Sequence, residues 1–286
     1  MRKPKLTDDD YPTTGHVWDG IREYDKPMPR WWLTTFILCI IWGIGYTIAY
    51  PAWPLIKGAT PGLLGYSSRA EVAEDIATVN NQNAQIEAKL LATPLEAVAN
   101  DAELARFATA GGQAVFRTYC SQCHGAGAGG AKGYPNLQDD DWLWGGDLTA
   151  LQTTIQHGIR FEQDENTRFS QMPKFGDFME KEDIAKLAEF VLSLSGQDHD
   201  GAMAEEGATL FADNCSGCHG EAGLGDREQG APNLADAIWL YGGDRETVSN
   251  SITNARFGVM PAWKGRITDA QIKQVTFYVH QLGGGE

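Results

Sequence analysis

Cysteine and basic residues are both scarce in this chain of 286 residues. Five cysteines are too few for a disulfide-stabilised scaffold. Lysine and arginine number 23 against 38 aspartates and glutamates, which gives a formal net charge of −15. This balance argues against a nucleic acid as the partner, because phosphates call for clustered positive charge. The hydrophobic fraction of 42% is too high for a disordered chain, and the length suffices for two modest domains with their own cores.

Charged residues are absent altogether from residues 31–56. A helix of that length would span about 39 Å, against a hydrocarbon core of about 30 Å, although Pro51 and Pro54 predict that it ends near residue 50. Aromatic residues stand at both ends of the segment, as they do at membrane interfaces. A signal peptide is the alternative, but the apolar segment is too long and no small-residue cleavage site follows. The sequence therefore predicts one uncleaved transmembrane helix within residues 31–54.

The charges on the two sides of this segment differ. Residues 1–30 carry equal numbers of acidic and basic side chains, with Lys26 and Arg30 close to the helix, whereas the net negative charge lies after residue 50. Lysine and arginine are enriched on the cytoplasmic side of membrane proteins. We therefore expect residues 1–30 in the cytoplasm and the rest of the chain on the other side. Cys39, inside the segment, is interpreted as an apolar packing residue.

The other four cysteines form two pentapeptides of identical spacing, Cys120-Ser-Gln-Cys123-His124 and Cys215-Ser-Gly-Cys218-His219. This C-x-x-C-H pattern is the attachment signature of c-type haem. The two thiols reach the two vinyl groups of one porphyrin, and the adjacent histidine ligates the iron. A redox dithiol or half of a zinc site is the alternative, which two copies that are both followed by His disfavour. The sequence predicts two covalently bound haems c, with His124 and His219 as proximal ligands.

The pentapeptides belong to a longer internal repeat. Each copy closes with an apolar stripe at steps of three and four residues, which predicts a helix. The two copies are offset by 95 to 97 residues up to a Trp-Gly-Gly block but by 88 at a later methionine, so the first copy has extra residues within 158–171. The matching segments are Ala114–Cys120 and Thr209–Cys215, Pro135–Leu137 and Pro232–Leu234, Trp142–Asp147 and Trp239–Asp244, and Met172-Pro173 and Met260-Pro261.

Each copy resembles a class I cytochrome c domain in its order of elements, from an opening helix through C-x-x-C-H and a Met-Pro loop to a closing helix. In that family the first and last helices cross, and Gly112 and Gly207 match the position that allows their close approach. The resemblance implies a mainly α fold, with one N-terminal transmembrane helix followed by two tandem class I cytochrome c domains. We expect a cytoplasmic segment at 1–30, the transmembrane helix at 31–54, a helical linker at 55–107, and cytochrome c domains at 108–197 and 202–286.

Methionine and histidine side chains are the candidates for the sixth iron ligand. Met172 and Met260 are predicted as axial ligands, because each precedes a proline that restricts its backbone and both hold matching places in the repeat. Whether each serves the haem of its own copy or of the other copy is open. Such ligation fills both axial positions and raises the reduction potential, which favours electron transfer and predicts no catalytic site in this chain. The weaker candidates are Met179, Met203, His157, His199 and His280.

One further segment indicates which family of membrane-anchored cytochromes the chain resembles. Residues 16–32, the apolar segment and Tyr50-Pro51 resemble the N-terminal region of the dihaem subunit III of cbb3-type cytochrome c oxidases, the FixP/CcoP family. The Pro-Asn-Leu and Trp-Leu-x-Gly-Gly-Asp blocks are similar to that family as well. Lys26 and Met28 depart from it, since members often have Asn and Leu there.

The resemblance implies an electron-entry subunit in the bacterial inner membrane. Electrons would pass from a soluble periplasmic cytochrome c or similar donor toward a monohaem cytochrome c subunit and then a haem–copper catalytic subunit, which reduces O2 to water and pumps protons. The acidic exterior would attract a basic donor, or would serve solubility alone. The alternatives are a free-standing membrane-tethered dihaem shuttle and the cytochrome subunit of a periplasmic dehydrogenase. A dihaem peroxidase or gas sensor would need a displaceable sixth ligand.

Overall fold

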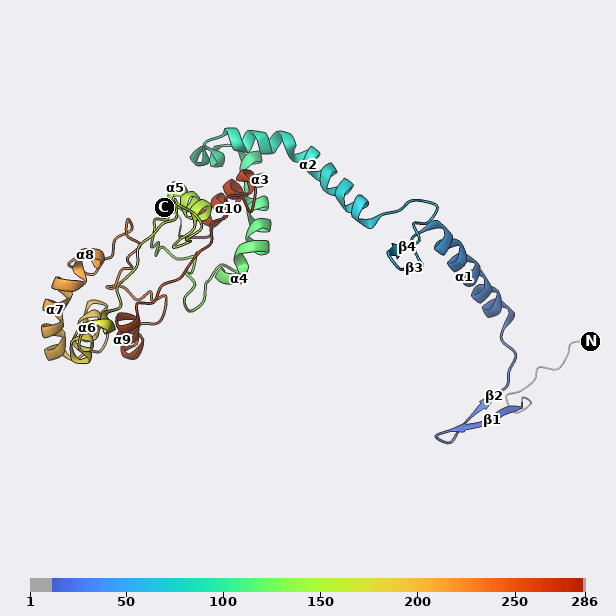
Figure 1. Ribbon diagram of the computed structural model, residues 1–286, viewed down its shortest axis with the longest axis horizontal. Helices are drawn as coiled ribbons and strands as arrows, with labels where there is room; N and C mark the ends of the chain where they lie inside the picture. The colour runs from blue at the N-terminus through green and yellow to red at the C-terminus, as the bar shows by residue number, and fades with distance from the viewer. Residues whose placement is uncertain (1–11, 285–286) are drawn as a thin grey trace, which may run out of the picture. The chain divides into compact units, whose positions relative to one another are not determined.

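The computed structural model describes residues 12–284 and is mainly helical, as predicted (Figure 1). The first part of the expected cytoplasmic segment, residues 1–11, lies outside the described residues, as do residues 285–286. The chain divides into two compact units, Met1–Asn81 and Gln82–Glu286, which are described separately below.

The first unit contains a β-hairpin and the apolar helix. Strands β1 (Thr13–Trp18) and β2 (Ile21–Tyr24) pair antiparallel. They are joined by Asp19 and Gly20, whose positive φ angles of 48° and 86° suit a tight hairpin turn. The sequence analysis did not predict this hairpin, although Asp-Gly is a strong hairpin signal. A second short pair, β3 (Pro54–Leu55) and β4 (Gly58–Ala59), follows the apolar helix.

The apolar helix α1 spans Arg30–Ala49, so it lies almost entirely within the predicted 31–54 and ends near residue 50, as expected from Pro51. Its 20 residues suffice to cross a bilayer by length and composition. None of them is buried by the protein, so the apolar surface is available to lipid. Tyr50 has an extended backbone and precedes Pro51, which ends the helix.

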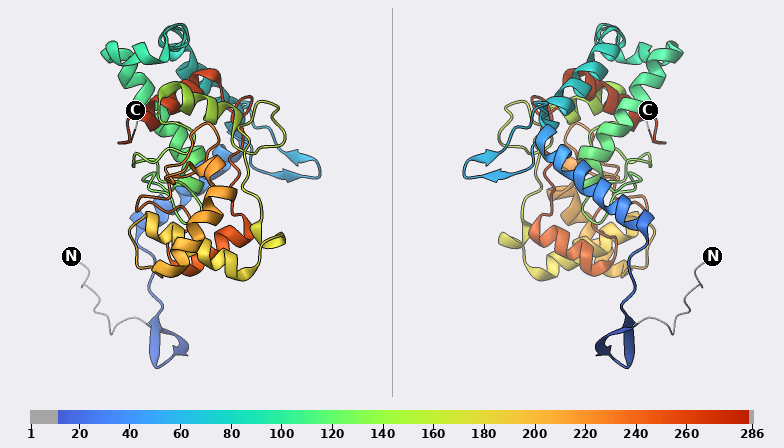
Figure 2. Two further views of the ribbon diagram at one scale, coloured as in Figure 1. Left: turned by 90° about the vertical axis from the view of Figure 1, so that its left-hand side faces the viewer. Right: turned by 90° about the vertical axis from the view of Figure 1, so that its right-hand side faces the viewer.

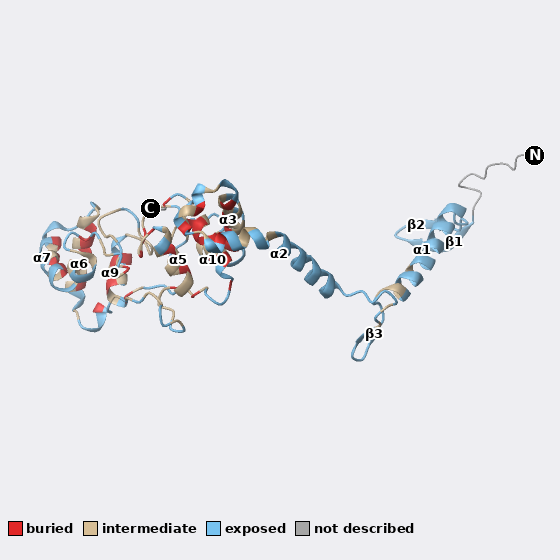
Figure 3. Ribbon diagram, turned by 90° about the horizontal axis from the view of Figure 1, so that it is seen from above, coloured by how far each residue is buried: buried red, intermediate tan, exposed pale blue. Residues whose placement is uncertain are grey.

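The second unit repeats four helical elements. Its first copy has α3 (Ala102–Val115), α4 (Ser121–His124), α5 (Leu148–His157) and α6 (Lys181–Leu194), and its second has α7 (Gly201–Asn214), α8 (Ser216–His219), α9 (Arg245–Asn254) and α10 (Asp269–His280). Three further short helical elements lie before or within the first copy: η2 (Leu95–Asn100), the π-helical η3 (Phe116–Cys120) and η4 (Phe175–Asp177). The long helix α2 (Ser68–Ala92) precedes them, and most of its surface is exposed (Figure 3).

Aspartates begin four of these helices. The carboxylates of Asp101 and Asp200 accept backbone N–H groups at the starts of α3 and α7, and those of Asp147 and Asp244 do so at α5 and α9. Such caps satisfy donors that have no partner inside the helix, and each is worth about 1 kcal/mol. Asp147 and Asp244 also align in the sequence repeat, whereas Asp101 lies 19 residues before Cys120 and Asp200 only 15 before Cys215.

The opening and closing helices pair crosswise between the two copies (Figure 1, Figure 2). α3 packs against α10 and α7 packs against α6. A Cβ atom on Gly112 would overlap the backbone carbonyl of Gln274 in α10, and one on Gly207 would overlap that of Lys186 in α6. The close approach expected at both glycines is therefore present. The expected crossing of the first and last helices within one copy is wrong, because the closing helix of each copy packs against the opening helix of the other copy.

We call α3, α4, α5 and α10 lobe 1, and α6, α7, α8 and α9 lobe 2. Each lobe has its own apolar core, with Phe116, Ile272 and Val275 almost fully buried in lobe 1 and Phe211 and Leu187 in lobe 2 (Figure 3). Burying such a side chain contributes about 1.5–3 kcal/mol. The domain boundaries 108–197 and 202–286 remain a prediction, because each lobe contains helices from both of these sequence ranges.

The linker is attached to lobe 1 through a third apolar cluster. Leu95 and Val98 of η2 are both buried there beside Leu90 of α2. Lys273 of α10 donates from Nζ to the Leu90 and Leu91 carbonyls at 3.0 and 3.1 Å. A cation suits these terminal carbonyls because the helix dipole is negative at this end.

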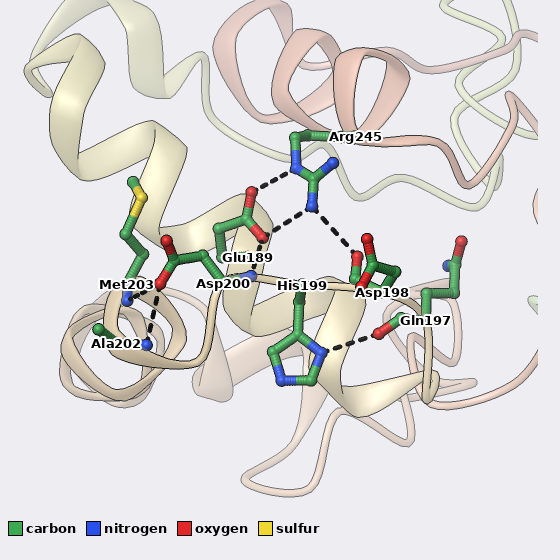
Figure 4. Close-up of polar contacts among 8 residues, drawn as sticks. All are labelled: Glu189, Gln197, Asp198, His199, Asp200, Ala202, Met203 and Arg245. Atoms are coloured by element: carbon green, nitrogen blue, oxygen red, sulfur yellow. Dashed lines mark hydrogen bonds and ion pairs between the residues drawn. The ribbon is translucent and has the colours of Figure 1, made fainter.

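Lobe 2 is closed by an ion pair whose carboxylate is buried and whose guanidinium is half-exposed (Figure 4). Glu189 of α6 is only 5% exposed and accepts from Arg245 of α9, with Oε1 2.5 Å from Nε and Oε2 3.1 Å from Nη2. Glu189 also accepts from the Asp200 backbone N–H at 2.7 Å, and Arg245 donates to the Asp198 carbonyl at 3.1 Å. One carboxylate therefore holds α6 against both the start of α7 and the start of α9.

Candidate haem centres

Each pentapeptide lies on a short helix directly after the opening helix of its copy. Cys120 and Cys215 are half-buried and pack against the cores of lobe 1 and lobe 2, whereas Cys123 and Cys218 are exposed. Burial raises the pKa of both inner thiols to about 11. They are therefore protonated at neutral pH, which disfavours a reactive dithiol because only the thiolate is a strong nucleophile.

The histidine of each pentapeptide is held by a carbonyl from the following loop. His124 Nδ1 lies 3.1 Å from the Pro135 oxygen, and His219 Nδ1 lies 3.1 Å from the Pro232 oxygen. Since a carbonyl only accepts, Nδ1 carries the proton and Nε2 keeps a free lone pair for a metal. Burial lowers the pKa of both imidazoles, which keeps them neutral and able to ligate.

The two methionines lie with the pentapeptides of the opposite copies. Met260 packs against the lobe 1 core, as Cys120 does, and Met172 packs against the lobe 2 core, as Cys215 does. Two backbone hydrogen bonds join the Met260 loop to the first copy, from Ile159 N–H to the Met260 oxygen at 2.9 Å and from Met260 N–H to the Ile159 oxygen at 3.0 Å. The structure thus brings each C-x-x-C-H motif into one lobe with one of the two predicted methionines.

The weaker candidates are engaged elsewhere or lie apart from the motifs. His157 Nδ1 is 3.1 Å from the carboxylate of Asp164, and His199 Nδ1 is 2.8 Å from the Gln197 oxygen. Met203 lies in the first turn of α7, and His280 in the last turn of α10. Met179 packs against the lobe 2 core near Met172, so burial alone does not separate the two.

The residues around the motifs fit a haem. Among residues 12–284, two buried side-chain nitrogens have no hydrogen-bond partner, Trp144 Nε1 and Arg168 Nε. A haem carries two carboxylates, which are acceptors without donors of their own. In the same part of the chain, no group of three His, Cys, Asp or Glu side chains has the arrangement of a metal site. Thiols, an oriented imidazole, a thioether and unmatched donors are the set that a c-type haem requires.

Comparisons with known proteins agree with this chemistry. Residues 11–57 match the family model of the N-terminal domain of cytochrome oxidase-cbb3, FixP, and residues 107–191 and 202–279 match that of cbb3-type cytochrome c oxidase subunit III. The chain is 59% identical to the cbb3-type oxidase subunit CcoP of Cereibacter sphaeroides, over 96% of both chains. It is 52% identical to FixP of Azorhizobium caulinodans, over 96% of this chain and 94% of FixP, and 50% identical to CcoP of Rhodobacter capsulatus over the full length of both. The chain belongs to the cbb3-type oxidase subunit III family.

Membership in the subunit III family confirms several predictions from the sequence. The mainly α fold with an apolar N-terminal helix and two tandem cytochrome domains is confirmed, as are haem c and a role in respiratory electron transport. A membrane-anchored cytochrome c subunit of a cbb3 oxidase is favoured over the free-standing shuttle and the dehydrogenase subunit.

Two structural features of this subunit III chain were not predicted from the sequence. The repeated Pro-Asn-Leu segment was recognised, but not that Pro135 and Pro232 orient the histidines through their carbonyls. Arg168 was missed because it lies among the residues where the two copies differ in length. Its only signal was the alignment of Arg168-Phe169 with Arg256-Phe257 before the two methionines.

Proposed function

We propose that this membrane-anchored cytochrome c subunit of a cbb3 oxidase binds two haems c and delivers electrons to its partner subunits. The first haem would be attached through Cys120 and Cys123 and the second through Cys215 and Cys218. When bound, each haem supplies one-electron transfer at its iron. The observation that carries the proposal is that each lobe joins one C-x-x-C-H motif, with a carbonyl-oriented histidine, to one methionine.

The axial ligands are proposed to be exchanged between the copies. His124 and Met260 would ligate the iron in lobe 1, and His219 and Met172 the iron in lobe 2. The support for this assignment is the packing of Met260 with Cys120 and of Met172 with Cys215. Because both axial positions are filled by the chain, dioxygen would be reduced in a partner subunit.

Interlocking of the lobes serves electron transfer by holding the two haems in a fixed arrangement. Gly133 N–H donates to the Leu240 oxygen at 2.8 Å between the lobes, while the Ile159–Met260 pair and the bond from Trp263 N–H to the Ile155 oxygen at 3.0 Å join the two copies within lobe 1. Neither lobe is complete without a helix from the other copy. The lobes therefore cannot swing apart as two domains on a flexible linker could, and the geometry between the haems stays constant.

The topology and partners follow from the anchor and the charge. We place residues 1–30 in the cytoplasm and both lobes in the periplasm, on the evidence of Lys26 and Arg30 before α1 and of the acidic remainder after it. Electrons would enter from a soluble periplasmic cytochrome c or similar donor. They would leave toward a monohaem cytochrome c subunit and the haem–copper subunit that reduces O2 and pumps protons.

The test is the composition of the complex that this chain joins. A tag on the chain allows purification in mild detergent, followed by a dithionite-reduced minus oxidised optical spectrum with and without CO. We expect c-type bands together with b-type bands and a CO-sensitive high-spin haem. The starting membranes must reduce O2 before purification. If the purified complex then shows only c-type bands that CO does not change, the proposed place in an oxidase is contradicted.

A further inference from the structure

Two buried nitrogen donors in this chain lack acceptors. Within residues 12–284, Trp144 Nε1 and Arg168 Nε are the buried side-chain N or O atoms without a hydrogen-bond partner. An unpaired buried donor has lost its hydrogen bonds to water without replacement, which destabilises the fold, and a charged donor does so more strongly. Native proteins rarely leave such groups unsatisfied, so each one calls for an explanation. Two on neighbouring side chains indicate one shared acceptor.

The two side chains are in contact. The Arg168 guanidinium carbon lies 5.5 Å from the centroid of the Trp144 ring, and the Trp144 residue is 8% exposed. Arg168 Nη2 donates to the Ala150 oxygen in α5 at 3.3 Å, which leaves Nε as the unmatched donor. Its backbone is fixed by hydrogen bonds with residues 158 and 160, from Arg168 N–H to the Gly158 oxygen at 3.2 Å and from Arg160 N–H to the Arg168 oxygen at 2.8 Å.

Among residues 12–284, the guanidinium has no carboxylate within ion-pair distance, and its charge is only partly offset. Burial lowers the pKa of Arg168, but a guanidinium remains protonated in proteins. The carboxylate that acts on it electrostatically is Asp147. Asp147 instead accepts the Ala150 backbone N–H at 2.9 Å as the cap of α5. The site therefore suits an additional anion with acceptor oxygens.

The same pairing occurs in the second copy. Arg256 aligns with Arg168 before the methionine, and Tyr241 aligns with Trp144 in the Trp-Gly-Gly block. The Arg256 guanidinium carbon lies 5.7 Å from the centroid of the Tyr241 ring. An arginine over an aromatic with a polar edge thus accompanies each C-x-x-C-H motif, which ties the pair to the group that the motif binds.

We infer that Trp144 and Arg168 form a carboxylate-binding pair for a propionate of the haem attached at Cys120 and Cys123. This inference rests on the proposed function. Arg168 contacts α5, and α5 contributes Leu151 and Ile155 to the core on which Cys120 packs, so the guanidinium lies on lobe 1, while the Trp144 indole also borders Gly230 of the second copy. Both donors would reach oxygens of one carboxylate, and the guanidinium would neutralise it. A cation held there favours the reduced iron, which carries one positive charge less than the oxidised iron.

The experiment measures the reduction potential of each haem in the full chain. In a Cys215→Ala/Cys218→Ala background only the first haem is attached, and in a Cys120→Ala/Cys123→Ala background only the second. Arg168→Gln removes the charge, Arg168→Lys keeps it without the planar fork, and Trp144→Phe removes one N–H. Arg106→Gln is the matched control, because Arg106 lies exposed on α3 in the same lobe.

For the first haem, Arg168→Gln is expected to shift the reduction equilibrium toward the oxidised form by about tenfold, which equals about 59 mV for a one-electron couple. Arg168→Lys is expected to keep the potential close to that of the unmodified chain, because the positive charge remains. Trp144→Phe is expected to give a smaller shift in the same direction as Arg168→Gln. The second haem and the Arg106→Gln control change by less than about twofold.

An unchanged potential of the first haem in both Arg168→Gln and Trp144→Phe would overturn the inference, as would a shift confined to the second haem. Haem counting keeps this failure separate from failure of the proposed function. Absence of covalent haem from the unmodified chain would refute the function itself. Two attached haems with normal Met ligation and no shift in the variants would refute only the carboxylate-binding pair.

Discussion

Replacing Gly112 by valine tests the crosswise helix pairing through stability. Gly112 lies in α3 where a Cβ would overlap the backbone carbonyl of Gln274 in α10, and a backbone atom cannot rotate away as a flexible side chain can. Overpacking of this kind costs about 1–3 kcal/mol. The better helix propensity of valine returns less than about 0.5 kcal/mol of it. We therefore expect a net loss of about 2 kcal/mol.

A loss of this size corresponds to a decrease of about 4–8 °C in melting temperature for a unit of this size. The assay is thermal unfolding of the haem-loaded chain in detergent, followed by circular dichroism. Gly201→Val is the matched control, because Gly201 also lies in a helix and a Cβ there meets nothing within 4 Å. A melting temperature of Gly112→Val equal to or above that of the control would refute the close approach of α3 and α10.

Three further predictions concern charge and attachment. The Arg245 guanidinium holds the pKa of Glu189 below its usual range, so the stability from this pair is present at neutral pH and lost as the pH falls below about 4.5. Glu189→Gln should lower the free energy of unfolding by about 2 kcal/mol at pH 7, measured by chemical unfolding, and should weaken the loss of stability at acid pH. Burial, with repulsion from neighbouring carboxylates, raises the pKa of Asp141 to about 6, so the folded state loses stability as the pH rises from about 4 to about 6. Asp141→Asn should therefore raise the melting temperature at pH 7.5 and leave it unchanged near pH 4, whereas an equal rise at both would contradict this pKa. Cys120→Ala should abolish covalent attachment at the first site and spare the second, giving one covalent haem per chain by haemochrome assay; two would contradict the motif interpretation.

The helices and the haem motifs could be predicted because their signals are local. A charge-free run indicates the α1 helix, and stripes at steps of three and four residues indicate α6 and α10. The C-x-x-C spacing with its adjacent His indicates haem attachment, since the porphyrin fixes the distance between its two attachment points. Both glycines of the close helix contacts were expected from the resemblance to class I cytochrome c domains.

The pairing of these elements could not be predicted, because the two copies are equivalent partners. α3 meets a similar apolar stripe whether it packs against α6 or α10, so the sequence pattern of either pairing is the same. The backbone hydrogen bonds between residues 159 and 260 that accompany the observed pairing carry no side-chain signature either. The roles of Pro135 and Pro232 were hidden for a similar reason, since they act through carbonyls that every residue possesses.

Exchange of the axial methionines is the central claim, and single-haem chains test it most directly. In the Cys215→Ala/Cys218→Ala background the remaining haem is the one proposed to bind Met260. We expect Met260→Ala to abolish the charge-transfer absorption of Met-ligated ferric haem and to lower the potential, while Met172→Ala leaves both unchanged. Loss of that absorption in Met172→Ala, with Met260→Ala silent, would show that each copy ligates its own haem and would contradict the account.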